Sequence, residues 1–328
     1  MKRFHIVTSI VLLLVFLGDW GKTTRALEPY PVRPITFIVP VEAGSDGDIL
    51  ARPISQKVSA LLGQPIVVVN KPGAGSTIGY REVHDSKADG YTIGVSFATI
   101  VSNKLQGILP YDYRDFTILG TYATYIPIIV ASTKTQRPFR TIEEVISFAK
   151  SHPGEVSMAT AGIGQSWWIA AMAFQAGTGL KFNMIPQPGS GGFAIAQVAG
   201  GHTDLAVLAL GAAKPQVEAG NVRFLAVFGS KRAPAPYDNV PTLKEIGYDI
   251  FWESTQTVIG PPKMPKDITD KLAKAFEKAA NEPEYQKFAI ERNAIPFVLT
   301  PEKAVQFLSQ QREVCQSIME KAGILKER

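Results

Sequence analysis

The sequence predicts an α/β protein made of two units, each a mostly parallel sheet with flanking helices. Short apolar runs rich in β-branched residues alternate with stretches of helical periodicity, and this alternation starts once near residue 35 and again near residue 141. In each unit a glycine-rich loop joins a strand to a helix: VPVEAGSDGDIL (39–50) and MATAGIGQSWWI (158–169). Ligands of open α/β sheets bind beyond the carboxyl ends of strands, so two such ends facing one another predict a binding cleft.

The first unit begins with ITFIVP (35–40), whose length and β-branched residues are typical of a buried strand. The stretch DILARPISQKVSALLG (48–63) has helical periodicity and ends at a glycine, and Pro53 predicts an offset or kinked first turn. PIVVVN (65–70) and YTIGVS (91–96) are predicted strands, separated by the turn KPGAGST.

The second unit begins with a predicted helix over 141–154, with Thr141 as its cap. The strand VSMAT, the glycine-rich loop and a helix that opens with Trp167 and Trp168 follow. The remaining elements of this unit are three apolar strands, over 182–187, 205–210 and 222–229, and one helix, over 192–201.

The C-terminal part is predicted to be helical. It follows the proline-rich segment GPPKMPKD (260–267) and contains three stretches of helical periodicity: 268–282, 283–293 and 301–323.

The N-terminus predicts a secretory signal peptide over residues 1–26. Lys2 and Arg3 precede an apolar run over 6–17, which is too short to span a bilayer comfortably, and cleavage is expected after Ala26 with Thr24 at the −3 position. An uncleaved anchor or a buried helix is the alternative. The protein is therefore expected to be exported to the periplasm as a free, soluble chain.

Charge and cysteine content exclude several classes. The segment 1–26 holds four of the 34 basic residues and one of the 29 acidic ones, so the remainder carries about +2, which gives no indication of nucleic-acid binding. Cys315 is the single cysteine of the chain, so no internal disulfide is possible, and its helical context favours packing over a nucleophilic role.

No catalytic, cofactor or metal site is predicted. His84, His152 and His202 lie in polar turn sequences, and the chain has no HExxH motif, no Cys/His cluster at metal-ligand spacing and no GxSxG elbow. The glycines of GAGSTIG (73–79) are wrongly spaced for a dinucleotide fingerprint.

Binding loops are better supported. The loops at 41–48, 96–99, 161–166 and 187–192 follow predicted strands and offer small residues, hydroxyls and backbone donors, which suit a carboxylate. In any single loop, tight turns explain the glycines equally well. Four such loops, divided between two units, favour a ligand site.

The ordered segments YPVRPITFIVP, LGQPIVVVNKPGAGSTIG, ADGYTIGV, HPGEVSMATAGIG, NVPTLKEIGY and KAGILKE resemble the extracytoplasmic solute receptors of tripartite tricarboxylate transporters, the Bug family. The resemblance covers nearly all of residues 30–327. It implies a periplasmic two-lobed Venus-flytrap fold with two crossover segments, one lobe formed by 30–124 and 252–328 and the other by 125–251. A monomer that binds a small organic carboxylate and docks on a membrane permease is implied, without catalysis. A sensing partner of a membrane kinase and an α/β enzyme with an unrecognised site are the alternatives.

The predicted ligand-binding residues lie in the four loops that follow predicted strands, at the start of the helix after the loop at 161–166 and at the crossover near residue 125. They are Val41, Glu42, Ser45, Asp46, Ser96, Phe97, Thr99, Tyr125, Ala161, Gly162, Gly164, Gln165, Ser166, Trp167, Gln187, Gly189 and Leu208. Leu208 lies on the predicted strand over 205–210.

Departures from the family pattern bear on the ligand. Glu42 and Asp46 stand where relatives carry an aromatic residue and glycines, and they would repel a carboxylate if they pointed inward. Leu208 stands where many relatives have an acidic residue that suits amine-bearing ligands, which argues against an amino acid.

The adjacent tryptophans favour an apolar ligand. Consecutive helical residues lie about 100° apart, so one of Trp167 and Trp168 is expected to face the cleft, unless both pack in the core. Phe97, Tyr122 and Tyr125 would add to an aromatic wall. An aromatic or largely apolar monocarboxylate or dicarboxylate is therefore predicted.

Overall fold

The computed structural model describes residues 30–188, 191–229, 231–233 and 235–326. The predicted signal peptide and Gly189 lie outside these described residues. Within them, no helix combines the length and apolar character that crossing a membrane requires.

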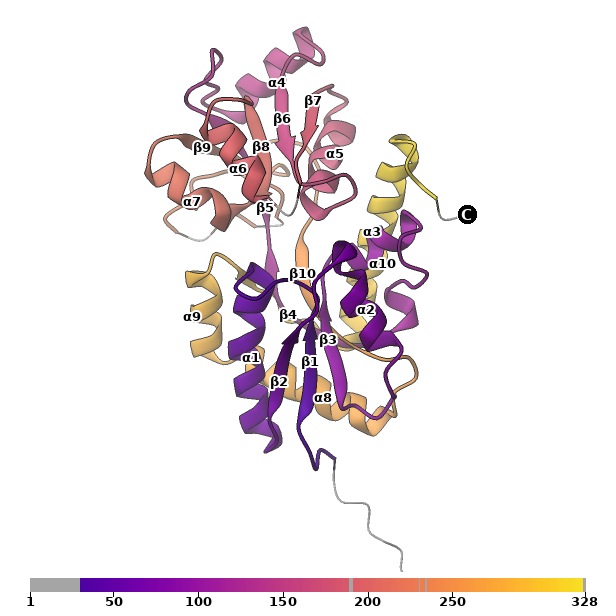
Figure 1. Cartoon of the computed structure of the whole chain (residues 1–328). Helices are drawn as coiled ribbons and strands as arrows, with labels where there is room; N and C mark the ends of the chain where they lie inside the picture. The colour runs from indigo at the N-terminus through magenta and orange to yellow at the C-terminus, as the bar shows by residue number, and fades with distance from the viewer. Residues whose placement is uncertain (1–29, 189–190, 230, 234, 327–328) are drawn as a thin grey trace, which may run out of the picture.

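Two sheets, each flanked by helices, give the molecule two lobes (Figure 1). The first sheet has the strand order β11-β4-β10-β3-β1-β2: β11 (Ile295–Pro296), β4 (Thr117–Tyr125), β10 (Ser254–Gly260), β3 (Thr92–Ser96), β1 (Ile35–Val39) and β2 (Ile66–Asn70). The second has the order β7-β6-β8-β5-β9: β7 (Asn183–Pro186), β6 (Ser157–Thr160), β8 (Leu205–Ala209), β5 (Pro127–Ser132) and β9 (Val222–Val227).

Both sheets are mixed, which corrects the prediction that each is mostly parallel. Strands β1, β2 and β3 pair in parallel, whereas β10 and β11 pair antiparallel to their neighbours. In the second sheet β6 is parallel to β7 and β8, whereas β5 is antiparallel to β8 and β9. The antiparallel strands arise because the chain leaves one lobe through β4 and enters the other directly through β5, then returns through β10.

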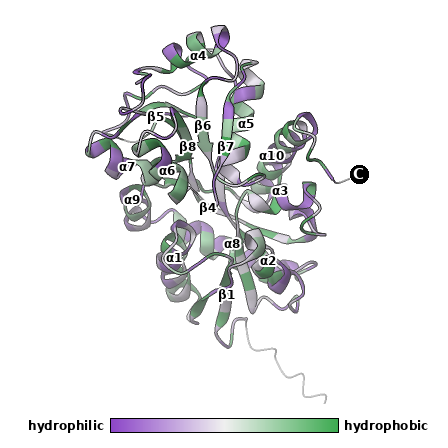
Figure 2. Cartoon of the chain, turned by 45° about the horizontal axis from the view of Figure 1, so that its top comes forward, coloured by the Kyte–Doolittle hydropathy of each residue, from purple (hydrophilic) through white to green (hydrophobic). Residues whose placement is uncertain are grey.

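The helices cover the sheets. Around the first sheet lie α1 (Asp46–Leu62), α2 (Thr77–His84), α3 (Thr99–Leu105), α8 (Lys266–Ala280), α9 (Pro283–Glu291) and α10 (Pro301–Lys321). Around the second lie α4 (Ile142–Ser151), α5 (Ser166–Thr178), α6 (Gly192–Ala199) and α7 (Leu210–Glu218). Figure 2 shows hydrophobic residues along β1 and hydrophilic residues on outer turns of helices such as α4 and α7.

Local signals set the ends of several helices as predicted. The hydroxyl of Thr141 accepts a hydrogen bond from the backbone N–H of Glu144 and so caps α4. Gly63 ends α1 in the left-handed conformation, with a φ of 69°, and its N–H donates to the carbonyl of Ser59. Helix α1 continues through Pro53 without a break.

Strand β10 was not predicted from the sequence, although it lies in the middle of the first sheet. Its residues Ser254, Thr255, Gln256 and Thr257 are polar and nevertheless buried. Hydrogen bonds compensate for the burial of two of them: the hydroxyls of Thr124 and Thr255 lie 3.2 Å apart, and the Tyr122 hydroxyl donates to the Gln256 side-chain oxygen at 3.2 Å. The hydroxyl of Thr257 has no hydrogen-bond partner among the described residues. A run of polar residues is typical of a loop in sequence, and only the neighbouring strands make it part of a core.

Cys315 lies fully buried in α10, as its helical context indicated, and burial raises the pKa of its thiol to about 12. We therefore expect iodoacetamide at pH 8.5 to leave the native protein unmodified and to alkylate the chain fully in guanidinium chloride, as mass spectrometry would show. The folded chain keeps this proton between about pH 9 and pH 12, where the unfolded chain loses it, so the free energy of unfolding falls over that range. Equal alkylation rates in the two states would contradict the burial.

Candidate functional site

A cavity of about 150 Å³ lies between the two lobes. The first lobe contributes the start of α1, the turn before α2, the β3–α3 connection, the end of β4 and the start of β10, and the second contributes the β6–α5 loop and the start of α5. The residues around it are Val41, Ser45, Asp46, Gly47, Ser76, Phe97, Thr99, Tyr125, Ala161, Gln165, Ser166, Trp167, Ser254 and Gln256.

Most of the residues predicted from the sequence meet at this cavity, although they are up to 126 positions apart in the chain. Those that line it are Val41, Ser45, Asp46, Phe97, Thr99, Tyr125, Ala161, Gln165, Ser166 and Trp167. Those that do not line it are Glu42, Ser96, Gly162, Gly164, Gln187 and Leu208.

The residues away from the cavity have other surroundings. Glu42 is exposed in its loop. Ser96 is fully buried and donates to the carbonyl of Thr257 at 3.4 Å. Leu208 is fully buried in β8, because strand β8 turns this side chain into the core of its lobe.

Gly162, Gly164 and Gln187 support the β6–α5 loop rather than the cavity surface. The backbone N–H of Gln187 donates to the carbonyl of Thr160, and the carbonyl of Gln187 faces the Cα of Gly162. The carbonyl of Gly164 accepts a hydrogen bond from the side chain of Gln106 at 3.4 Å. Gln106 follows α3 of the first lobe, so this contact joins the lobes beside the cavity.

The start of α5 presents hydrogen-bond donors to the cavity. No side chain caps this helix end, and its first turn carries no acidic residue. The N–H groups of a first helical turn have no acceptor within their own helix. Gln165, Ser166 and Trp167 line the cavity at this point, so these donors and the positive end of the helix dipole lie beside it.

The hydroxyl of Ser166 is oriented by Trp252, which lies in the connection between β9 and β10. The indole N–H of the fully buried Trp252 donates to Ser166 Oγ at 2.9 Å. Because this bond uses Ser166 Oγ as an acceptor, its own hydrogen is available to a ligand.

The two adjacent tryptophans are both buried in the hydrophobic core, with Trp167 8% exposed and Trp168 5% exposed, and they differ in their relation to the cavity. Trp167 lines the cavity and packs beside Gly191, whose Cα lies close to the indole ring. Trp168 does not line the cavity and is 5% exposed within the hydrophobic core. The 100° rotation between neighbouring helical residues accounts for this division.

Four cavity residues were not predicted: Gly47, Ser76, Ser254 and Gln256. Gly47 allows Phe97 to approach, because a Cβ at position 47 would lie 2.6 Å from its ring. The glycine within VEAGSDG was a visible signal for this contact. Ser254 and Gln256 belong to the unpredicted strand β10, and their sequence carried no comparable signal.

Ser76 enters the site through a strained turn. Its φ is +75° and that of Ala74 is +46°, which is the left-handed region that side chains rarely adopt. Between them, Gly75 lies close to the side-chain nitrogen of Gln165 in the other lobe. Left-handed non-glycine residues are frequent at functional sites, where the surrounding structure holds them in place.

In the described part of the chain, the residues that line the cavity include no lysine, arginine or histidine. Asp46 is open to solvent, yet protein atoms surround its carboxylate, and this partial desolvation raises its pKa above the usual range. Burial raises the pKa of Tyr125, and the nearby Asp46 carboxylate raises it further. The Tyr125 hydroxyl donates to the backbone carbonyl of Asp46 at 3.1 Å, so it binds the peptide group rather than the carboxylate.

Asp48, two residues further along α1, has a structural role. Its carboxylate accepts hydrogen bonds from the backbone N–H of Gly44 and from the side chains of Arg52 and Asn70. Burial alone would raise the pKa of Asp48, but these bonds outweigh it and lower the pKa. Asp48 therefore fixes the loop that carries Ser45 and Asp46.

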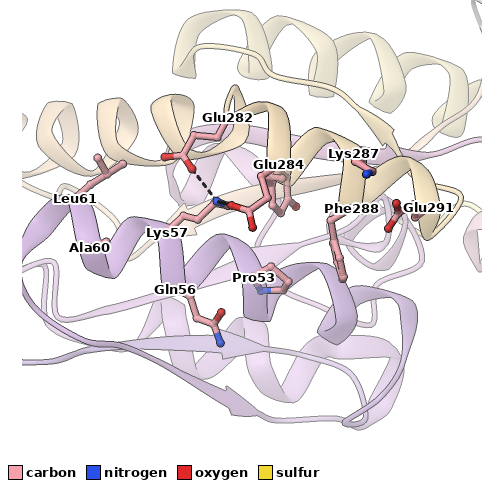
Figure 3. A pocket seen from close by; sticks show the side chains of 11 residues that line it. Pro53, Gln56, Lys57, Ala60, Leu61, Glu282, Glu284, Lys287, Phe288 and Glu291 are labelled. Carbon is pink, nitrogen blue, oxygen red and sulfur yellow. Dashed lines mark hydrogen bonds and ion pairs between the residues drawn. The ribbon is translucent and has the colours of Figure 1, made fainter.

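A larger cavity of about 670 Å³ lies in the first lobe between α1 and α9 (Figure 3). The ammonium of Lys57 is already paired there with Glu282 at 2.8 Å and Glu284 at 2.6 Å. Lys287 adds a positive charge and Glu291 a further negative one. With Lys57 already paired and three carboxylates against two ammonium groups, the lining of this cavity is net negative, which makes it less suited to an organic anion than the cavity between the lobes.

Comparison with known proteins gives one family over most of the chain. Residues 50–324 match the model of the tripartite tricarboxylate transporter family receptor. The chain is 30% identical to the protein BugT of Bordetella pertussis over 331 residues, which covers 97% of this chain and 98% of BugT.

Solved structures share the two-lobed fold. A TctC solute-binding protein from Polaromonas superposes with a TM-score of 0.78 at 27% identity, over 89% of this chain and 99% of its own. A protein of R. palustris solved with adipate superposes with a TM-score of 0.77 at 27% identity, over 90% of this chain and 99% of its own.

Proposed function

The chain belongs to the tripartite tricarboxylate transporter receptor family, whose members are solute-binding receptors rather than enzymes, and we propose that it captures a small organic carboxylate between its lobes for delivery to a membrane permease. The proposal includes export to the periplasm through cleavage of residues 1–26, and a clamp formed by lobes over 30–124 with 252–328 and over 125–251. Relatives described as periplasmic binding proteins support this location.

The observation that carries the proposal is the start of α5. Among the described residues, no acceptor is paired with the backbone N–H groups of Ser166 and Trp167, and the described lining of the cavity has no cationic side chain. The Ser166 hydroxyl and the positive end of the helix dipole lie beside the same cavity. Such a helix end binds a carboxylate without a counter-charge. The adipate found in a relative with 27% identity is a ligand of this chemical class.

The body of the ligand would lie against aromatic surface. Trp167 and Phe97 line the cavity from opposite lobes, and Tyr125 is adjacent to the Asp46 loop. Flat or extended apolar groups gain from burial and from stacking on such rings. We therefore propose a carboxylate with an aromatic or otherwise apolar body.

Ligand binding is expected to close the lobes. A carboxylate held by α5 and an apolar body held by Phe97 would connect both lobes, so small-angle X-ray scattering should show a smaller radius of gyration at saturating ligand. Hexanoate, benzoate, adipate and terephthalate provide a first panel for calorimetry and scattering. Binding without compaction would contradict the clamp, and a failure of the whole panel to bind would count against a carboxylate site.

A further inference from the structure

We propose that the cavity holds the two ends of its ligand by opposite chemistry: α5 receives a carboxylate, and Asp46 receives an ammonium or another hydrogen-bond donor from the other end of the ligand. The ligand class is then a carboxylate with a distant amine or amide, and a dicarboxylate is disfavoured. This inference rests on the proposed function, because it takes the carboxylate at α5 as given.

The charge distribution in the cavity supports this assignment. Among the described residues that line the cavity, Asp46 has the one carboxylate, and the others, including the Tyr125 phenol, are neutral. Within the described residues, Asp46 forms no ion pair, whereas Asp48 is paired with Arg52 at 2.8 Å. The described residues therefore place no cation in an ion pair with Asp46, although Arg292 lies near enough to Tyr125 to act on the pKa of that phenol, and a second ligand carboxylate beside Asp46 would be repelled.

The helix that carries Asp46 is also a poor anion site. Asp46 and Asp48 both lie in the first turn of α1, and the N–H of Gly44 is already bound by Asp48. Acidic side chains in a first turn interact favourably with the helix dipole and so occupy the place of an external anion. The first turn of α5 carries no acidic residue, so the two helix starts that meet at the cavity have opposite preferences.

Hydrogen-bond donors on β10 and α5 also line the cavity. The side chain of Gln256 is 1% exposed, lines the cavity, and uses its oxygen to accept the Tyr122 hydroxyl. Its amide nitrogen is the part left to donate to a ligand. The Ser166 hydroxyl, held by Trp252, is a second donor. These donors suit a carboxylate, and Asp46 is the acceptor that suits an ammonium or amide.

Leu208 provides no acidic partner for a ligand amine, but Asp46 provides one from the other lobe. Asp46 lies on α1 of the first lobe and the donors of α5 lie on the second lobe, so the favoured ligand carries its amine and its carboxylate on opposite sides of its body. An α-amino acid, with both groups on one carbon, would not engage both ends.

Matched probe pairs test the inference. Adipate and 6-aminohexanoate have chains of six carbons, and terephthalate and 4-(aminomethyl)benzoate share a para-substituted ring. Calorimetry at pH 7.5 and low salt should show the amine-bearing member of each pair binding at least ten-fold more tightly to the native protein. Asp46→Asn should reduce this preference about ten-fold, chiefly by weakening the amine-bearing ligands and strengthening the dicarboxylates.

Glu42→Gln is the matched control. It removes one negative charge from the same loop at an exposed position that does not line the cavity, so the preference should be unchanged. Melting temperatures of both variants confirm that they fold. Equal or tighter binding of the dicarboxylates to the native protein, or an unchanged preference in Asp46→Asn, would overturn the inference. If hexanoate and benzoate bind while the preference is absent, the carboxylate site stands and the role of Asp46 is wrong. If none of the probes binds, both the role of Asp46 and the carboxylate site fail.

Discussion

Gly164→Val is expected to lower the affinity for a carboxylate at least ten-fold. This should be among the largest effects on affinity of any single substitution in the β6–α5 loop. Gly164 has a φ of +77°, a conformation that costs a residue with a side chain roughly 1–2 kcal/mol, and a β-branched residue more. A Cβ at this position would also lie 2.0–2.3 Å from the side-chain amide of Gln106. That amide can rotate away, but the hydrogen bond between the lobes is then lost.

The physical reason for the loss of affinity is the loop shape. The turn at Gly164 sets the direction in which Gln165 and Ser166 enter the cavity, and a change there misaligns the N–H groups of α5. Isothermal titration calorimetry measures the dissociation constant, Kd, for the tightest-binding carboxylate of the panel, and a ten-fold change corresponds to about 1.4 kcal/mol.

Gly162→Ala provides the control in the same loop. Its φ is outside the left-handed region, and a Cβ would meet the Gln187 carbonyl oxygen at 3.6 Å, which is an ordinary contact. Its Kd should remain within two- to three-fold of the native value, on the order of 0.5 kcal/mol. An unchanged Kd in Gly164→Val would show that this loop does not position the ligand.

Trp167→Ala and Trp168→Ala are expected to differ in their effect on binding, although both should lower the free energy of unfolding because both side chains are buried in the hydrophobic core. Trp168 lies in the core away from the cavity, so its replacement should lower the free energy of unfolding by about 3–5 kcal/mol. Its effect on the Kd of the folded fraction should be small. Trp167 lines the cavity, so its replacement removes a ligand contact and should weaken binding of an aromatic carboxylate by about ten-fold or more. The lost ring contact accounts for about 0.5–1.5 kcal/mol, and the apolar surface that is no longer buried adds to it.

Urea denaturation and calorimetry measure the two effects. Trp168→Phe preserves an aromatic core residue and serves where Trp168→Ala does not fold. Tryptophan emission gives a second readout, because Trp167→Phe should abolish most of the change that an aromatic ligand causes. Loss of affinity through Trp168 with no effect of Trp167 would reverse the assignment of the two side chains.

Local patterns predicted most elements of the fold. The strands β1, β2, β3, β6, β7, β8 and β9 and the helices α1, α4, α5, α6, α8, α9 and α10 follow from periodicity, capping residues and glycine stops. These signals are local because the apolar face of a helix or strand appears as a periodic pattern of hydrophobic residues in its own sequence. The strands β4, β5 and β10 were missed, although they connect the lobes.

The site shows the same division. The sequence indicated the loops at 41–48 and 161–166, because glycines and hydroxyls at a strand end identify a possible anion site without reference to the rest of the fold. It could not indicate Gln256, because the polar residues of β10 become cavity and core residues only through pairing with β3 and β4.

The sequence by itself determined the α/β architecture, the family and the two loops that meet at the cavity. The tertiary structure decided which side chains line it: Trp167 and not Trp168. It also decided that Asp46 has no ion-pair partner among the described residues, whereas Asp48 accepts hydrogen bonds from Gly44, Arg52 and Asn70. Neighbouring residues of the same type cannot be distinguished by composition or spacing. Their environments differ because Arg52 and Asn70 reach Asp48 and not Asp46, and because consecutive residues of α5 point in directions about 100° apart.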